Sequence, residues 1–296
     1  MAITLGVDIG GTSIKLALME GDRTLATARG RIYQRPDRAT FESVLADALR
    51  SFPRAAEAEA IGLCAPGLID PSTLAITLSA NHPGLVGVPL NELLAAALGR
   101  DVAREHLVII SDAHAAAHDF WYTADPPIAP GERLLAISLG TGVGACVLDD
   151  GRPLQVSGTS SGHLGQIDLG LDLHTERPIG PDGGAGSAEA YLGIAALKAR
   201  FGTQLVAALT ELDPRQAPGL ALVQLLRIAH AIYRPAHMAL LGGIGMRLAG
   251  SLPAIRVAVA RDLTSVARPG WTLRSGSSDF HAACGVARIA GTGRPT

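Results

Sequence analysis

One arrangement of apolar runs around a glycine-rich turn occurs twice in this chain, and this repetition constrains its fold most. In the first half, the apolar residues 3–9 are followed by Gly10-Gly11 and by a second apolar run. In the second half, residues 134–138 precede Leu139-Gly140-Thr141-Gly142-Val143-Gly144, and residues 144–149 follow. Short apolar runs on both sides of a glycine turn are typical of strand–turn–strand units. The sequence therefore predicts a duplicated unit.

Strands alternate with helices in both halves. The apolar residues 60–64 and 107–110 are predicted strands, and residues 90–98 between them have helical spacing and stop at Gly99. Such alternation predicts an α/β fold. The other predicted strands are 14–19, 24–33, 153–156 and 237–241, and the other predicted helices are 39–52, 112–122, 187–200, 219–233 and 246–263.

Length and proline content suggest two domains. A chain of 296 residues, 48% of them hydrophobic, can form two cores of ordinary size. Prolines 126, 127 and 130 mark a surface loop or hinge near the middle. We predict a small α/β domain at 1–112, with a C-terminal helix at about 285–296 packing back on it, and a large α/β domain at 113–284.

Charge and hydropathy exclude several classes of partner. With 25 Lys+Arg against 27 Asp+Glu, the chain has no basic excess for nucleic acid. The apolar residues 134–148 are interrupted by glycines and are too short to span a bilayer, and Asp8 breaks any signal-peptide core. Three widely spaced cysteines form no Cys-x-x-Cys pair. We expect a cytoplasmic protein with reduced thiols and neither nucleic-acid nor membrane partners.

The first glycine turn has the composition of a phosphate site. Asp8 ends a strand and Gly10, Gly11 and Thr12 follow it. Glycines let backbone amides approach a phosphate, and a strand-end carboxylate can hold hydrated Mg²⁺. The alternative is an ordinary tight turn, which glycine pairs also form.

Two further glycine elements occur in the second half. Gly140, Thr141, Gly142 and Gly144 occupy the position equivalent to the first turn, and two such turns could hold a nucleoside triphosphate between two domains. Gly242 and Gly243 follow a predicted strand and precede a helix, which suits close approach to an adenosine. Alone, the latter would be a helix-entry turn.

Together these motifs resemble those of the ROK (repressor, open reading frame, kinase) family of sugar kinases, of the actin, Hsp70 and hexokinase superfamily. The resemblance rests on residues 6–15, 138–144 and 241–245, and residues 65–70, 81–84 and 189–191 are similar to family segments in the same order. It implies two duplicated ribonuclease-H-like α/β domains with a cleft between them, a homodimer, and ATP- and Mg-dependent phosphorylation of a small-molecule sugar. Lys15 belongs to the resembling nucleotide motif.

The resemblance also implies roles for individual residues. Asp112 matches the aspartate of the family's Asn-Asp pair, the general base, and Ser111 stands where the asparagine usually is. Asn81 and Glu189 match substrate-contacting positions, and Asp8 would hold Mg²⁺ through water. The alternative role for Asp112 is to cap the helix that follows it.

The sequence departs from the family in its sugar-binding segment. The family has Gly-Glu-x-Gly-His, whereas this chain has Gly162-His163-Leu164-Gly165-Gln166, so that His163 replaces the glutamate and Gln166 the histidine. A shifted alignment would place Ser160 at the glutamate. Either way the carboxylate acceptor is missing, which makes glucose itself a weaker expectation.

The family's zinc-binding cysteines are also missing. The matching residues 180–189 keep glycines and Glu189 but hold no thiol, so we predict no structural zinc. His163, His174 and Asp182 fit no recognised zinc spacing. His114 and His118 could share one helical face, yet two buried neutral histidines are the simpler interpretation.

The leading hypothesis is therefore a glucokinase-like kinase acting on a hexose or hexose derivative. An N-acetylhexosamine kinase is the first alternative, and a polyphosphate-using enzyme is disfavoured because the chain lacks a basic tract. The alternative from another class is a non-catalytic sugar-sensing or regulatory ROK protein. Family repressors carry an N-terminal helix-turn-helix, whereas here the first motif begins at Gly6.

Overall fold

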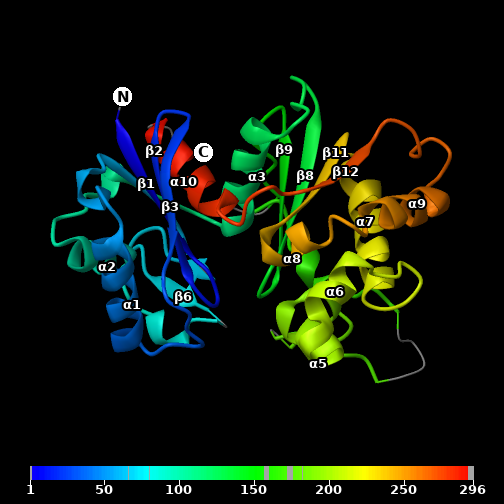
Figure 1. Cartoon of the computed structure of the whole chain (residues 1–296), viewed down its shortest axis with the longest axis horizontal. Helices are drawn as coiled ribbons and strands as arrows, with labels where there is room; N and C mark the ends of the chain where they lie inside the picture. Colours follow the sequence, from blue (N-terminus) through cyan, green and yellow to red (C-terminus); the bar gives the residue numbers. More distant parts are fainter. Residues whose placement is uncertain are drawn as a thin grey trace. The chain divides into compact units, whose positions relative to one another are not determined.

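The computed structural model describes residues 2–65, 67–79, 81–156, 160–171, 176–181 and 183–292, and its chain divides into two compact units (Figure 1). Met1–Asp119 and Phe280–Thr296 form the first unit, and Phe120–Asp279 forms the second. The domain division predicted above stays a prediction, since compactness alone does not define a domain that folds by itself.

Both units are built on a five-stranded sheet of the same design. In the first unit the order is β3-β2-β1-β4-β7, and in the second it is β10-β9-β8-β11-β12. In each sheet the first three strands pair antiparallel and the last two add in parallel. The strands are β1 (Ile3–Ile9), β2 (Ile14–Glu20), β3 (Arg23–Arg29), β4 (Ala60–Cys64), β7 (Leu107–Ile110), β8 (Arg133–Leu139), β9 (Val143–Asp149), β10 (Arg152–Pro153), β11 (His237–Leu241) and β12 (Thr272–Ser275). The predicted duplication and the α/β class are confirmed.

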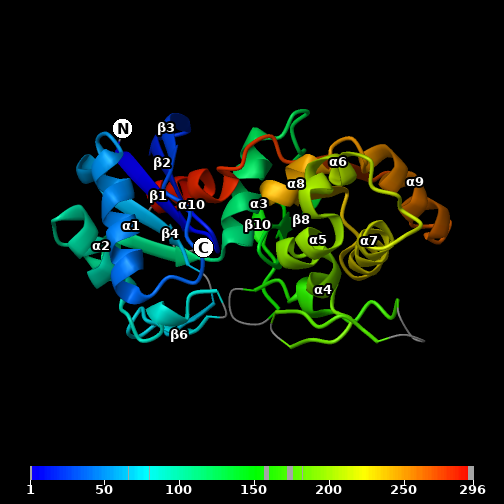
Figure 2. The same ribbon diagram turned by 60° about the horizontal axis from the view of Figure 1, so that its bottom comes forward.

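Helices cover both faces of the first sheet. On one face β2 contributes Leu16 and Leu18 to a core shared with Phe41 of α1 (Arg38–Ser51) and with α2 (Leu90–Leu98). On the other face Ala17 and Met19 pack against α10 (His281–Gly291), which Figure 2 shows on the opposite side of the sheet from α1. Successive strand residues point to opposite faces, so the apolar run of β2 serves both cores.

Two glycines let α10 lie directly on the sheet. Gly6 of β1 and Gly62 of β4 are register partners. A Cβ atom at Gly6 would overlap the Ala283 carbonyl, and one at Gly62 would overlap the Val286 carbonyl. This contact brings α10, which follows the second unit in the sequence, into the first unit's core.

The second unit carries most of the helices and shows where the predictions were wrong. The predicted helix 187–200 is broken at Gly193, whose backbone is extended, into α4 (Ala188–Leu192) and α5 (Ile194–Phe201). The predicted helix 246–263 is two helices, α8 (Gly242–Arg247) and α9 (Leu252–Asp262), because Pro253 sits in the first turn of α9 and cannot extend a preceding helix. The predicted strand 153–156 is shorter in the structure, where β10 ends at Pro153. In the first unit, the predicted strand 24–33 is β3, which ends at Arg29.

Several elements were not predicted at all. They are the hairpin of β5 (Leu68–Ile69) and β6 (Ile76–Leu78), the strand β12, the helix α6 (Leu205–Thr210) and five 3₁₀ turns at Ala55–Glu57, Pro83–Leu85, Arg104–His106, Leu164–Gln166 and Gly202–Gln204. Most are too short for a periodic pattern to emerge.

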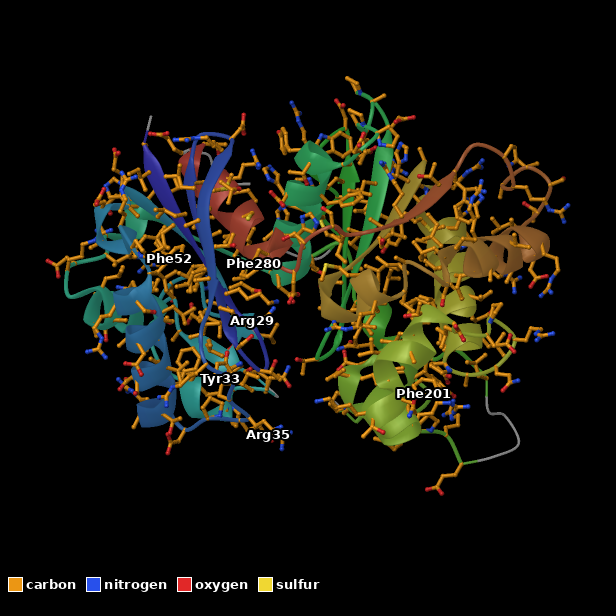
Figure 3. All side chains as sticks on the ribbon, viewed as in Figure 1. Arg29, Tyr33, Arg35, Phe52, Phe201 and Phe280 are labelled. Atoms are coloured by element: carbon orange, nitrogen blue, oxygen red, sulfur yellow. The ribbon has the colours of Figure 1, made fainter. Side chains whose placement is uncertain are left out.

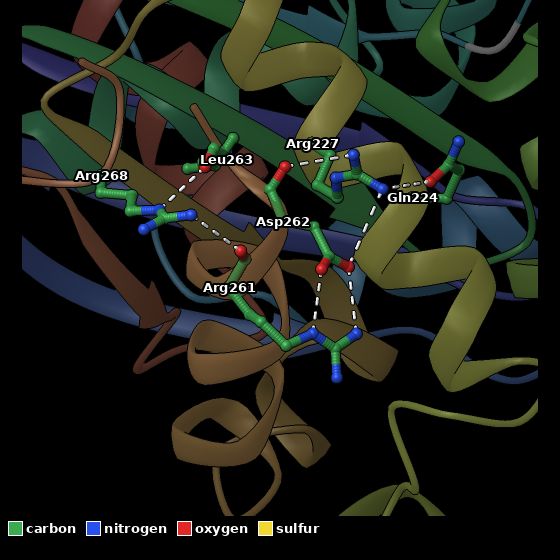
Figure 4. A network of polar contacts seen from close by, with 6 residues as sticks. All are labelled: Gln224, Arg227, Arg261, Asp262, Leu263 and Arg268. Carbon is green, nitrogen blue, oxygen red and sulfur yellow. Dashed lines mark hydrogen bonds and ion pairs between the residues drawn. The ribbon is translucent and has the colours of Figure 1, made fainter. Parts of the chain in front are cut away.

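The helices α7 (Gly219–Tyr233) and α9 are in contact in the second unit. Leu222, Leu225, Leu226 and Ala229 of α7 are fully buried. At the surface, Arg227 of α7 donates to the Asp262 carbonyl at the end of α9, while Arg261 binds the Asp262 carboxylate (Figure 4). Exposed ion pairs contribute little stability, so the apolar core to which both helices contribute is the larger stabilising term.

All three cysteines are free and buried, as expected. Within the described ranges, every helix is too short or too polar to cross a lipid bilayer.

Candidate active site

Two predicted carboxylates meet at one edge of the first sheet. Asp8 of β1 is paired with Cys64 of β4, and Cys64 with Ile110 of β7, two residues before Asp112. Burial raises the pKa of the Cys64 thiol well above its ordinary value, and the charges of Asp8 and Asp112 raise it further. The strand register thus places Asp8, and Asp112 just beyond the end of β7, at the same edge of the first sheet.

The start of α3 (Asp112–Thr123) leaves the Asp112 carboxylate exposed. The Ser111 hydroxyl accepts a hydrogen bond from the His114 amide at 3.3 Å, the usual bond of a helix N-cap. Asp112 is the first helical residue, and its Oδ1 accepts from the Ala113 amide at 2.8 Å. Ser111 thus makes the N-cap bond to the third helical residue, and Asp112 is accessible to solvent.

A row of charged side chains crosses the sheet beside the first glycine turn. Asp8 faces Lys15 across β1 and β2, and Lys15 faces Arg29 across β2 and β3. The Lys15 Nζ lies 3.5 Å from Asp8 Oδ2. Arg29 donates to the Ser13 hydroxyl at 3.1 Å, and its guanidinium carbon lies 6.0 Å from the centroid of the Phe280 ring (Figure 3). Arg29 has no local sequence signal, because only the strand register aligns it with Lys15.

The first glycine turn is held from inside the first unit. The Gly10 carbonyl accepts hydrogen bonds from the Tyr33 hydroxyl at 2.5 Å and from His82 Nε2 at 3.1 Å. The Thr12 carbonyl accepts from the Tyr33 amide at 2.9 Å. Asn81, half-buried, precedes His82. The predicted phosphate turn and the predicted substrate segment are therefore in direct contact.

Three predicted segments meet at the second glycine turn, in the second unit. The Val143 amide donates to Glu189 Oε2 at 2.9 Å, and a Cβ at Gly142 would lie 2.6 Å from the same oxygen. A Cβ at Gly165 would overlap the Val143 carbonyl. His163 and Gln166 are exposed on either side of the buried Gly165. Glu189, predicted to contact sugar, also supports this turn.

The third glycine element adjoins the same turn. Gly242 has a φ of +76°, and a Cβ there would lie 2.6 Å from the Leu139 carbonyl, at the end of β8. Gly243 follows in α8. Gly140 and Thr141 are half-buried in the loop. Gly144, by contrast, lies in β9 and pairs with Ser138.

No group of three or more metal-ligating side chains gathers anywhere in the described ranges. Two of the residues considered for zinc, His174 and Asp182, lie outside those ranges. His114 and His118 are 4% and 8% exposed, and burial lowers the pKa of each to about 4. Both are buried neutral histidines of α3, in agreement with the simpler interpretation.

Acid is expected to destabilise the protein through these two histidines. An unfolded histidine binds a proton below about pH 6.5, whereas the folded ones do so only near pH 4. The free energy of unfolding should therefore fall as the pH decreases from about 6.5 to about 4, by on the order of 2 kcal/mol for each histidine. Urea unfolding at about pH 7 and about pH 4.5 measures the loss.

The acid effect has a matched control. His118→Leu should lose part of the acid sensitivity, because one histidine with a lowered pKa is gone while His114, His82 and His230 remain. His106→Gln, at an exposed position, should keep all of it. Equal acid sensitivity in the His118→Leu variant and the wild type would contradict this assignment.

Comparison with known proteins places these features in one family. The model of the ROK family matches residues 4–292. An N-acetylmannosamine kinase of Salmonella paratyphi A is 32% identical over 168 residues, which are 55% of this chain and 53% of that protein. The chain thus spans about half the length of the curated relatives it matches.

Solved structures share the fold over almost the whole chain. The ROK hexokinase from Thermus thermophilus is 25% identical with a TM-score of 0.70, and the alignment covers 98% of each chain. A ROK family glucokinase from Streptomyces griseus, in complex with glucose and AMPPNP, is 20% identical with a TM-score of 0.73, covering 98% of this chain and 100% of that one.

Proposed function

The chain belongs to the ROK family, and on this premise we propose that it is an ATP-dependent kinase that phosphorylates a hydroxyl of a hexose or hexose derivative. The observation that carries the proposal is the pair of carboxylates, Asp8 and Asp112, which the register of β1, β4 and β7 places at one edge of the first sheet. One glycine turn directly follows Asp8. A base beside a phosphate-binding turn is what phosphoryl transfer requires.

Asp112 would act as the base. Its exposed carboxylate accepts the proton of the attacking sugar hydroxyl while that oxygen bonds to the γ-phosphorus of ATP. The bond from the γ-phosphorus to the bridging oxygen breaks, and ADP leaves. The amides of Gly11 and Thr12 would bind phosphate oxygens, and the turn at residues 140–142 stays a second proposed phosphate turn, in the other unit.

Mg²⁺ fits the donors at this edge. Asp8 offers hard carboxylate oxygens, and Mg²⁺ is commonly bound through one or two carboxylates while it keeps several waters. Asp8, at the strand end, would hold the hydrated ion. The ion would neutralise phosphate charge.

The sugar would be selected by groups other than a glutamate at position 163. His163 and Gln166 offer fewer acceptor sites for sugar hydroxyls than a carboxylate does. An N-acetylhexosamine is the second candidate substrate, because the chain is 32% identical to an N-acetylmannosamine kinase over 168 residues. Asn81, Ser111 and Glu189 stay proposed substrate contacts, and a homodimer stays a proposal.

A coupled ADP-release assay tests the function. ATP and Mg²⁺ would be supplied with a panel of hexoses, N-acetylhexosamines, ketoses and polyols, and polyphosphate would replace ATP in a parallel series. Turnover on at least one sugar with ATP is the expected result. No ADP release with any sugar of the panel, together with no ATP binding, would contradict the proposal and favour the regulatory alternative.

A further inference from the structure

Two buried side chains donate hydrogen bonds to one backbone oxygen, the carbonyl of Gly10. Tyr33 Oη and His82 Nε2 both donate to the Gly10 carbonyl, at 2.5 and 3.1 Å, although they come from segments 23 and 72 residues away in the sequence. Phe41 packs edge-on against both rings, with centroids 5.8 and 5.5 Å away. The result is a fixed platform beneath the first glycine turn, which Tyr33 approaches from the segment between β3 and α1 (Figure 3).

A buried histidine at position 82 would destabilise the fold relative to an apolar residue if its only role were to fill space. It is 0% exposed, and its Nδ1 has no hydrogen-bond partner among the described residues. A buried polar atom without a partner is unfavourable, and an apolar side chain would pack against Tyr33 and Phe41 without that loss. What histidine adds here is the donor at Nε2.

Burial also fixes the state of the ring. It lowers the pKa of His82, so the imidazole is neutral and carries one proton. A carbonyl oxygen can only accept, so that proton sits on Nε2, and Nδ1 keeps its lone pair. The His82 ring therefore donates its single N–H, at Nε2, to the Gly10 carbonyl.

Hydrogen bonds to the Gly10 carbonyl also fix the direction of the Gly11 N–H. The carbonyl of Gly10 and the N–H of Gly11 belong to one planar trans peptide and point in opposite directions. Two donors that fix the carbonyl towards the interior therefore direct the Gly11 N–H outwards. Hydrogen bonds to the carbonyl also polarise the peptide, which strengthens its N–H as a donor.

His82 also belongs to the segment that carries Asn81. The His82 amide donates to the Ser79 hydroxyl at 3.1 Å, and the His82 carbonyl accepts from the Leu85 amide at 3.0 Å. A Cβ at Gly84 would lie 2.8 Å from the Pro36 carbonyl, so the segment is docked against the residues that follow Tyr33. The turn and the Asn81 segment are one packed assembly.

We propose that His82, together with Tyr33, is a positioning residue that orients the Gly11 amide for a nucleotide phosphate and ties the Asn81 segment to the phosphate turn. This inference rests on the proposed function and adds to it the residues that shape the nucleotide site. Neither residue touches the reacting atoms in this assignment.

Nucleotide affinity tests the inference without needing the sugar. The dissociation constant of Mg·AMPPNP would be measured by calorimetry on the full chain. His82→Leu, which keeps the volume but removes the donor, is expected to weaken binding about five- to tenfold. His82→Gln, whose side-chain amide can donate in place of Nε2, should bind near the wild-type value. Equal affinity in His82→Leu and wild type, or no rescue by glutamine, would overturn the inference.

Two further variants separate positioning from packing. Tyr33→Phe removes one oxygen and keeps the ring, so it should also weaken binding, and it tests the platform even where His82→Leu does not fold. Phe52→Leu removes a ring from the same apolar core, outside the contacts among Tyr33, His82 and Phe41, and its affinity should stay unchanged. A Phe52→Leu loss as large as that of His82→Leu would show a packing role only.

Hydrogen exchange provides a readout that is independent of nucleotide. In the free protein, the amides of residues 10–13 should exchange faster in His82→Leu and Tyr33→Phe than in wild type, because the turn has lost a restraint. A wild type that binds no nucleotide would refute the proposed function, and the exchange rates would still decide whether His82 holds the turn. Unchanged exchange in both variants would overturn the inference.

Discussion

An Asp112→Asn variant is expected to turn over about 10³-fold more slowly than the wild type while binding Mg·AMPPNP with similar affinity. The amide is nearly isosteric with the carboxylate, and its oxygen can still accept from the Ala113 amide, so α3 should begin as before. What it cannot do is take the proton of a sugar hydroxyl. The measurement pairs the ADP-release rate with calorimetry on the nucleotide.

A matched control distinguishes base catalysis from a general loss of negative charge. Asp101 is another exposed aspartate of the first unit, remote in sequence from the glycine turns, and Asp101→Asn makes the same chemical change. Its turnover should equal that of the wild type. Near-normal turnover in Asp112→Asn would remove Asp112 from the role of base, whereas loss of nucleotide binding would assign it to the nucleotide site.

The sheets could be predicted from the sequence because their signals are local. Residues 3–9, 60–64, 107–110 and 237–241 are short, mostly apolar runs, and each is a strand with the predicted bounds. The helix breaks could not be predicted in this way. Gly193 interrupts a continuous apolar pattern, and its position is set by tertiary contact: a Cβ there would lie 3.2 Å from the Thr141 carbonyl.

The candidate site also contains residues that a local sequence pattern indicates and residues that it does not. Glycines and an aspartate at a strand end indicate a phosphate turn from adjacent residues alone. The role of Asp112 as base came from the resemblance of the Ser111-Asp112 pair to the family's Asn-Asp pair. Tyr33, His82 and Arg29 carry no such signal. They reach the turn through strand register or through contacts between distant segments, and a single sequence does not encode those explicitly.

Glu189 shows how a predicted role can be only part of a residue's function. The resemblance assigned its carboxylate to sugar, and in the structure one oxygen accepts from the Val143 amide in the second glycine turn. A carboxylate has two oxygens and about four acceptor sites, so support of the turn leaves capacity for a hydroxyl. The sugar contact stays a prediction.

The largest loss of stability is expected from Asp119→Asn, at about 3–5 kcal/mol in the free energy of unfolding. Asp119 is 4% exposed, and it accepts from His281 Nδ1 at 2.6 Å and from Arg288 Nη2 at 3.4 Å. Arg288 is 9% exposed, so its charge depends on the buried carboxylate for compensation. Urea unfolding of the full chain, followed by circular dichroism, measures the change.

Asp22 provides the control, because it binds the same guanidinium from the surface. Its side chain is 90% exposed, and Asp22→Asn should cost less than about 1 kcal/mol. Asp119 lies in α3, ahead of the second unit in the sequence, whereas His281 and Arg288 lie in α10, after it. The buried carboxylate therefore joins the two chain segments that build the first unit, and its loss should loosen α10 from the face of the first sheet. Equal, small losses in Asp119→Asn and Asp22→Asn would show that the apolar contacts of α10 hold the segments together without it.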